Sequence, residues 1–143
     1  MQWNDKGNHA GWLIATSQLL DYNYASIPGL YFQGIFAPRK LTGDVYTFGL
    51  MASQGRDKRR LFMLEVWPSH VVSHRDQNGS LEGSHIHLGD ERLGDHVVRK
   101  VRGTLDEVVL TRWIERFRRH TRIENNGSYA LNHPLSDGLF ESI

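Results

Sequence analysis

Three runs of aromatic and apolar residues, separated by residues that favour turns, restrict the fold more than any other part of the chain. The runs cover residues 29–36, 44–52 and 60–67. Aromatic and β-branched residues favour strands, and the turn formers Gly43 and Gly55 lie between the runs. Shorter strand-like runs follow at residues 70–75, 84–88 and 97–101. The sequence therefore predicts a mainly antiparallel sheet of five or six strands within residues 29–102.

Helical spacing of apolar residues occurs on both sides of this predicted sheet. The apolar residues of the first segment leave one apolar side on a helix, which predicts an N-terminal helical segment within residues 1–24. Later residues such as Trp113 and Phe117 recur at helical spacing and predict an amphipathic helix over residues 104–122. Turn formers are frequent in residues 123–143, which predicts an irregular tail. The predicted fold class is α+β, with both helices packed on the sheet.

The composition is that of one soluble domain covering residues 1–143. The chain has no cysteine, which excludes disulfides, thiolate nucleophiles and cysteine-ligated zinc. No apolar run approaches the roughly 18 residues of a membrane span, and the N-terminus lacks the order of a signal peptide. We therefore expect a cytoplasmic protein without a membrane partner.

Histidines are concentrated in the middle of the chain, where five of the eight lie within residues 70–96. Asn78–Gly79 favours a turn, so the residues on either side of it are predicted to form two antiparallel strands joined by a loop. If His74 stands opposite His85, then His74, His85 and His87 all lie on the same face of the two paired strands. This register predicts that the three imidazoles project together, and a slip of one residue would separate them.

A metal site is one interpretation of these histidines. His74, His85 and His87 would supply nitrogen ligands, and Asp90 or Glu91 would supply an oxygen. Such a set suits a divalent transition metal such as Zn²⁺, Fe²⁺ or Mn²⁺, with a coordination position left open for chemistry.

The spacing of this stretch resembles the first motif of the cupin barrels. Gly79 is followed by five residues, then by His85 and His87, three further residues and Glu91. In cupins the two histidines and the glutamate bind the metal, which the resemblance implies for His85, His87 and Glu91. The second cupin motif has no counterpart downstream.

Two other interpretations of the histidines remain open. In the first, an acid–base site for RNA or another phosphodiester, His74, His85 or His87 transfers protons and Arg75 holds the anion. Histidine titrates near neutral pH, which suits such a role. In the second, the histidines are ordinary half-buried polar residues that hydrogen-bond to one another, to Asp76 or to the backbone.

Basic residues gather after the histidine stretch. Residues 92–122 hold nine Lys or Arg against four Asp or Glu. An arginine-rich helix face can follow nucleic-acid phosphates, so nucleic acid is a candidate partner. The residues predicted for such a surface are Arg99, Lys100, Arg102, Arg112, Arg116, Arg119 and Arg122.

The chain also resembles an uncharacterised family of small bacterial and phage-borne proteins. The resemblance runs from about Asp44 to Ile123, and combines an aromatic strand, a basic hairpin, a histidine–glycine pattern and a helix of the WIERF type. The residues that match the histidine–glycine pattern are His74, Arg75, Gly79, Gly83, His85 and His87. Membership would imply an α+β fold and an origin on mobile or accessory DNA, and it implies no particular activity.

The sequence favours a small non-enzymatic accessory or binding protein of the mobile-element type, with a protein partner or a second copy of the chain as further candidate partners. A nucleic-acid-binding protein and a metal-dependent or acid–base enzyme are the alternatives. These hypotheses make different demands on the histidines and on the arginines, and the sequence does not choose between them.

Overall fold

The computed structural model describes residues 1–90, 95–102, 110–124 and 134 of the chain. The strands are β1 (Asn4–Asp5), β2 (Leu13–Leu20), β3 (Ser26–Ala37), β4 (Val45–Gln54), β5 (Asp57–Val66), β6 (Val72–Asp76), β7 (Gly79–Glu82), β8 (His85–Asp90) and β9 (Asp95–Lys100). One helix, α1 (Leu110–Thr121), follows them in the described part. The predicted α+β class and the mainly antiparallel sheet are confirmed. The prediction of five or six strands is wrong, because seven strands form one sheet and two more form a separate hairpin.

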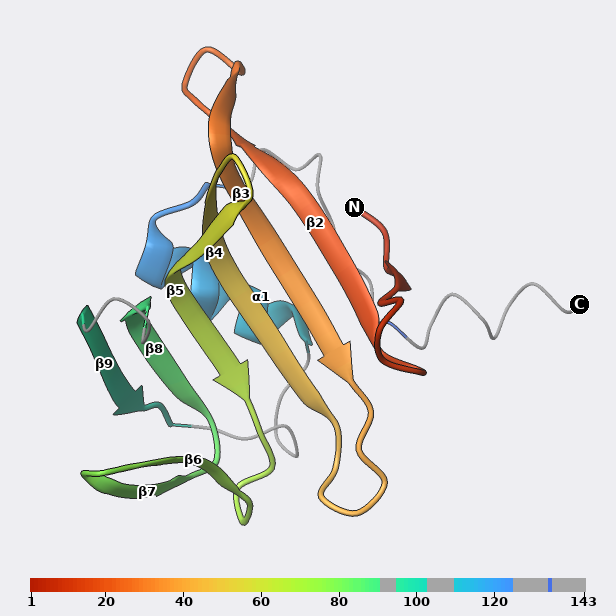
Figure 1. Ribbon diagram of the computed structural model, residues 1–143, viewed down its shortest axis with the longest axis vertical. Coiled ribbons are helices and arrows are strands. Elements are labelled where there is room, and N and C mark those ends of the chain that lie inside the picture. The colour runs from red at the N-terminus through yellow and green to blue at the C-terminus, as the bar shows by residue number, and fades with distance from the viewer. Residues whose placement is uncertain (91–94, 103–109, 125–133, 135–143) are drawn as a thin grey trace, which may run out of the picture.

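The seven-stranded sheet has the order β1-β2-β3-β4-β5-β8-β9, and all of its neighbouring strands are antiparallel. Helix α1 lies against one face, as Figure 1 shows, while the β6–β7 hairpin lies at one end of β5 and β8. The hydrophobic core fills the space between α1 and the sheet. Its largest fully buried side chains are Trp113, Phe36, Phe48, Phe117, Leu64 and Val66.

The C-terminal helix follows the predicted periodicity. Trp113 and Phe117, one helical turn apart, are both buried, and the Phe117 ring meets the rings of Phe32, Phe48 and Phe62 on three adjacent strands. The predicted start of this helix at residues 104–109, and most of the predicted tail, lie outside the described residues. Within the described part, no helix is long and apolar enough to cross a membrane.

The predicted N-terminal helix is wrong, because the segment forms strand β2. Leu13, Ala15 and Leu19 alternate along the chain and contact the core on one face, which is the period of a strand. A short apolar run fits a helix and a strand about equally well in the sequence. Pairing with β3, from Leu13 opposite Phe36 to Leu20 opposite Ser26, gives the backbone its hydrogen-bond partners and decides the conformation.

The predicted pairing of the histidine strands is also wrong. Strand β6 pairs with β7 through a two-residue turn between Asp76 and Gly79, and β8 pairs with β5 and β9 instead. The Asp76 carboxylate accepts a 2.7 Å hydrogen bond from the Asn78 N–H, and Gly79 has a φ of 126° that favours glycine. The turn is therefore tight, and strand pairing resumes at Gly79, within what was predicted to be a loop.

Gly29 provides a test of the contact between β3 and β4. Its φ is 73°, and a Cβ atom placed there would lie 2.3 Å from the carbonyl oxygen of Ser53. We expect Gly29→Ala to lower the free energy of unfolding by about 2–4 kcal/mol, because the left-handed backbone and the steric clash both cost energy. Urea denaturation measures the change.

Gly55→Ala is the matched control. Gly55 also has a positive φ, of 60°, but a Cβ atom there meets nothing within 4 Å. Only the backbone cost applies, so we expect a loss of about 1–2 kcal/mol. Equal losses for the two variants would show that the close approach of Gly29 to Ser53 does not limit the packing of the sheet.

Candidate metal centre

The face of the sheet opposite α1 carries a cluster of polar side chains. Residues directly opposite one another on paired strands share a face. Glu65 on β5 stands opposite His85 on β8, and Met63 stands opposite His87. Their neighbours Leu64 and Ile86 lie in the core beneath α1, so alternation along the strands directs Glu65, His85 and His87 to the other side.

Three side-chain atoms converge at the centre of this cluster. The Oε2 atom of Glu65 lies 2.7 Å from Nε2 of His85 and 3.2 Å from Nε2 of His87. The two Nε2 atoms are 2.9 Å apart. These atoms form a nearly equilateral triangle, which we call the Glu65–His85–His87 triangle.

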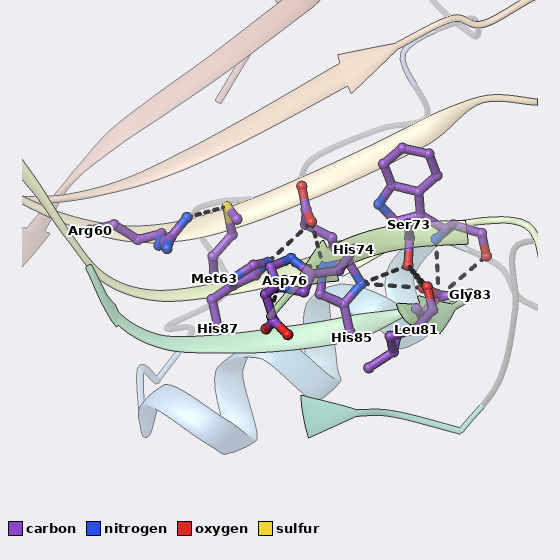
Figure 2. A network of polar contacts seen from close by, with 12 residues as sticks. Arg60, Met63, Ser73, His74, Asp76, Leu81, Gly83, His85 and His87 are labelled. Atoms are coloured by element: carbon purple, nitrogen blue, oxygen red, sulfur yellow. Dashed lines mark hydrogen bonds and ion pairs between the residues drawn. The ribbon is translucent and has the colours of Figure 1, made fainter. Parts of the chain in front are cut away.

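His74 reaches the same place from the β6–β7 hairpin. Its ring centroid lies 5.7 Å from that of His85 and 5.2 Å from that of His87, and Figure 2 shows these three histidines and Asp76 in one cluster. The ligand atoms of the three histidines lie within 4.8 Å of one another, so the group can hold a metal ion. The imidazoles thus lie together as predicted, although the hairpin and β8 approach one another without pairing.

The hydrogen bonds of His85 determine which of its ring nitrogens carries the proton. Its Nδ1 atom lies 3.2 Å from the carbonyl oxygen of Gly83 and 3.1 Å from Oγ of Ser73. The Ser73 hydroxyl donates to that same carbonyl at 2.6 Å, so its oxygen accepts from His85. Because a carbonyl only accepts, Nδ1 carries a proton, and a ring with no second proton presents an unprotonated Nε2 to the triangle.

His96 on β9 extends the cluster on the far side of His87. It stands opposite Gly89, on the same face of the sheet as His85 and His87. Its Nε2 atom lies 2.8 Å from Nδ1 of His87, and the two rings stack with their centroids 5.1 Å apart. His87 therefore has one ring nitrogen in the triangle and the other held by His96.

The pKa values of both Glu65 and His87 are lowered in the cluster. Burial raises the pKa of Glu65, but hydrogen bonds and charge interactions with His85 and His87 outweigh it and lower the pKa to about 2. Burial lowers the pKa of His87, against the opposing effect of Glu65. At neutral pH, Glu65 is therefore ionised. Burial of His87 disfavours its protonated form.

The turn of the hairpin carries the partner of His74. Nε2 of His74 lies 3.1 Å from Oδ2 of Asp76. The hydrogen bond from the Asn78 N–H and the contact with His74 lower the pKa of Asp76. Asp76 therefore orients the His74 ring as a second-sphere carboxylate orients a metal-binding histidine.

Other predicted site residues lie elsewhere. Alternation along β6 directs Arg75 away from His74, and Arg75 is exposed. Asp90 accepts a hydrogen bond from the backbone N–H of Arg60 at 3.2 Å and is not part of the triangle. Glu91, the predicted oxygen ligand, lies outside the described residues.

Glu65 and His96 were not predicted as site residues. Glu65 is the only charged residue in an otherwise apolar run, Leu61–Trp67, and a carboxylate at such a position is a sign of a buried partner. His96 follows residues 74–91, which hold all the predicted ligands. Both come from strands that only the sheet order places beside β8.

The predicted nucleic-acid surface is spread over several elements. Arg99 stands opposite Ile86 on the helix side of β9, while Lys100 stands opposite His85 on the other side. Arg116 stacks on the Trp113 ring at 4.6 Å and donates to the carbonyl of Arg102. The other members, Arg112, Arg119 and Arg122, are exposed. Because Arg99 and Lys100 face opposite sides, the seven residues do not share one face, and nucleic-acid binding stays a prediction.

Comparison with protein-family models, with curated proteins and with solved structures finds no match for this chain. The resemblances to the cupin motif and to the small phage-borne family therefore stay predictions.

Proposed function

We propose that the protein binds one divalent transition-metal ion and acts as a metal-dependent enzyme. The ligands are Nε2 of His85, Nε2 of His87 and Oε2 of Glu65, and His74 is the fourth. The observation that carries the proposal is the Glu65–His85–His87 triangle, in which three electron-rich atoms lie within 3.2 Å of one another.

The triangle calls for a cation. In a neutral His85 the proton sits on Nδ1, so its Nε2 lone pair points at the Glu65 carboxylate 2.7 Å away. Two lone pairs at this distance repel one another unless a proton or a metal ion lies between them. Burial lowers the pKa of His87 and so favours its neutral form, and the neutral form of a histidine is the one that binds metal.

The dimensions favour one coordination geometry. Bonds of about 2.1 Å at right angles to one another place neighbouring ligand atoms about 3.0 Å apart, whereas tetrahedral angles place them about 3.4 Å apart. The edges of 2.7, 2.9 and 3.2 Å agree with the first value. Two histidines and one carboxylate on one face of an octahedron form the set typical of Fe²⁺ enzymes, and this set also suits Mn²⁺.

Access to the centre is limited to one side. The side chains of His85 and His87 are 0% and 3% exposed, whereas those of Glu65 and His74 are 19% and 15% exposed. Coordination positions beyond the four protein ligands would therefore face the opening beside Glu65 and His74. An ion held there supplies Lewis-acid activation of whatever binds at those positions.

Metal stoichiometry and the cobalt absorption spectrum test the proposal. Untagged protein is first stripped of metal with a chelator. It is then dialysed against Mn²⁺, against Co²⁺, or against Fe²⁺ in the absence of oxygen. We expect it to retain one ion per chain in each case. The Co²⁺ protein is expected to absorb weakly in the visible, as octahedral sites do, because the ligand spacing is octahedral. His85→Ala is expected to retain less than a tenth of this metal.

His70→Ala is the matched control, since His70 is an exposed histidine on the same part of the chain and is not part of the cluster. It is expected to bind like the unchanged protein. Equal retention by His85→Ala, or no retention by the unchanged chain, would overturn the proposal. A non-enzymatic accessory or binding role would then be the leading hypothesis.

A further inference from the structure

The histidine side of the sheet also contains a hollow of about 360 Å³, next to the candidate metal centre. Two residues of its lining connect it with the centre. Thr47 stands opposite Glu65 across β4 and β5, and Met63 stands opposite His87 across β5 and β8. The hollow and the triangle are therefore neighbours on one continuous face, and Figure 2 shows Met63 and Arg60 on the His87 side of the histidines.

Gly49 is part of the lining of the hollow, and a Cβ atom placed there would lie 3.3 Å from the Met51 sulfur. Gly49 lies between Gln33 and Met63 in a row across three strands, and it is the member of that row without a side chain. The thioethers of Met51 and Met63 line the space around it. The volume is within the range of sites that take small molecules, and the methionine walls offer an apolar surface that adapts to a ligand.

The end of the hollow away from Glu65 is basic. A bulge in β5 leaves Leu61 without a partner and turns Arg60 to the side of Met51. The Arg60 guanidinium lies along the wall, since its Nε–H donates to the Gly89 carbonyl at 3.2 Å and one terminal nitrogen lies 3.9 Å from the Met63 sulfur. With Lys58 and Asp90 also in the lining, the hollow has two cations and one anion.

We propose that this hollow is the substrate pocket of the metal centre and that it takes a small organic anion. The carboxylate or phosphate of the ligand lies at Lys58 and Arg60, its apolar body lies against Met51 and Met63, and its other end reaches toward Glu65 and the ion. The assignment as a substrate pocket rests on the proposed metal-dependent function. The shape and charge of the hollow do not depend on the ion.

Methionine methyl NMR tests the pocket. The chain has three methionines, of which Met51 and Met63 line the hollow, while Met1 packs against the core elsewhere. With ¹³C-methyl methionine in the chain, benzoate is expected to shift the Met51 and Met63 signals saturably and to leave Met1 unchanged. Benzamide has nearly the same shape without the charge, and it is expected to bind at least tenfold more weakly. The Met51 and Met63 shifts are expected in both metal-free and Zn²⁺-loaded protein.

Two variants separate charge from shape. Lys58→Gln, at an exposed position, is expected to weaken benzoate binding about tenfold and to leave benzamide binding unchanged. Gly49→Val is expected to fill the hollow and to abolish the shifts caused by both probes. Equal affinity for benzoate and benzamide, or no saturable shift of Met51 and Met63, would overturn the proposal.

Further outcomes distinguish this proposal from the metal proposal. In one such outcome, benzoate binds only when metal is present and still binds to Gly49→Val. That result would place the anion on the ion and would overturn the proposal that the hollow binds it. With Co²⁺ bound, the Met63 signal is expected to shift more than the Met1 signal, because Met63 lies next to the candidate metal centre. Binding of benzoate in the hollow of a protein that fails the metal-retention test would overturn the substrate role.

Discussion

Replacing Phe117 with alanine is expected to lower the free energy of unfolding by about 3–5 kcal/mol. The Phe117 side chain is 1% exposed, and its ring lies 5.4 Å from that of Phe32, 6.3 Å from that of Phe48 and 5.8 Å from that of Phe62. One side chain of α1 therefore contacts three neighbouring strands. Its removal loses apolar burial and leaves a cavity that side chains from three separate strands cannot easily fill.

Urea denaturation, followed by circular dichroism, measures this loss. Arg119→Ala is the control, because Arg119 is exposed on the same helix, and we expect it to change the free energy of unfolding by less than about 0.5 kcal/mol. A loss below about 1 kcal/mol for Phe117→Ala would contradict the packing of α1 as the cover of the core. Metal binding is expected to persist in Phe117→Ala under folding conditions, since the candidate centre is on the opposite face.

Metal binding is expected to stabilise the folded chain. When the free ion is at about 1,000 times its Kd, an ion that binds only the folded state adds about 4 kcal/mol to the free energy of unfolding. Glu65 and His85 are brought together only by the pairing of β5 with β8, so the unfolded chain has no comparable site. Urea denaturation of the Mn²⁺-loaded and chelator-treated protein measures the difference.

Substitution of the ligands is expected to remove this gain. His85→Ala should reduce it to about 1.4 kcal/mol or less at the same concentration of ion, because a site at least a hundredfold weaker loses about 2.7 kcal/mol or more. Ser73→Ala should have a smaller effect, about a tenfold loss of affinity, because Ser73 only holds the ring of His85 through Nδ1. The control His70→Ala should keep the full gain. A gain that survives in His85→Ala would place the ion elsewhere.

Local sequence patterns were sufficient for part of the fold. Alternation and turn signals identified β3, β4, β5, β8 and β9, and helical periodicity identified α1, because in these segments one period dominates. The turn at Asp76–Gly79 was also apparent, since asparagine and glycine favour its backbone conformation.

The same reasoning failed where two interpretations of a pattern were open. The apolar residues of the Leu13–Leu20 segment fit a helix or a strand, and only pairing with β3 makes it β2. The turn at Asn78 predicted a hairpin but not its second strand, because Leu81 is the one apolar residue of Gly79–Glu82 and gives no alternation. Both errors concern a choice of partner, and pairing depends on the whole sheet.

In the candidate site, too, some features follow from the local sequence and others follow only from strand pairing. By itself, the sequence determined the α+β class and the helix that covers the core. His74, His85 and His87 lie together as predicted, but through a strand pairing other than the predicted one. Tertiary structure alone decided that β5 and β9 flank β8, which brings Glu65 and His96 to the histidines and places the hollow beside them. The physical reason is that periodicity acts within a segment, whereas the neighbours of a strand are chosen by backbone pairing and burial over the whole chain.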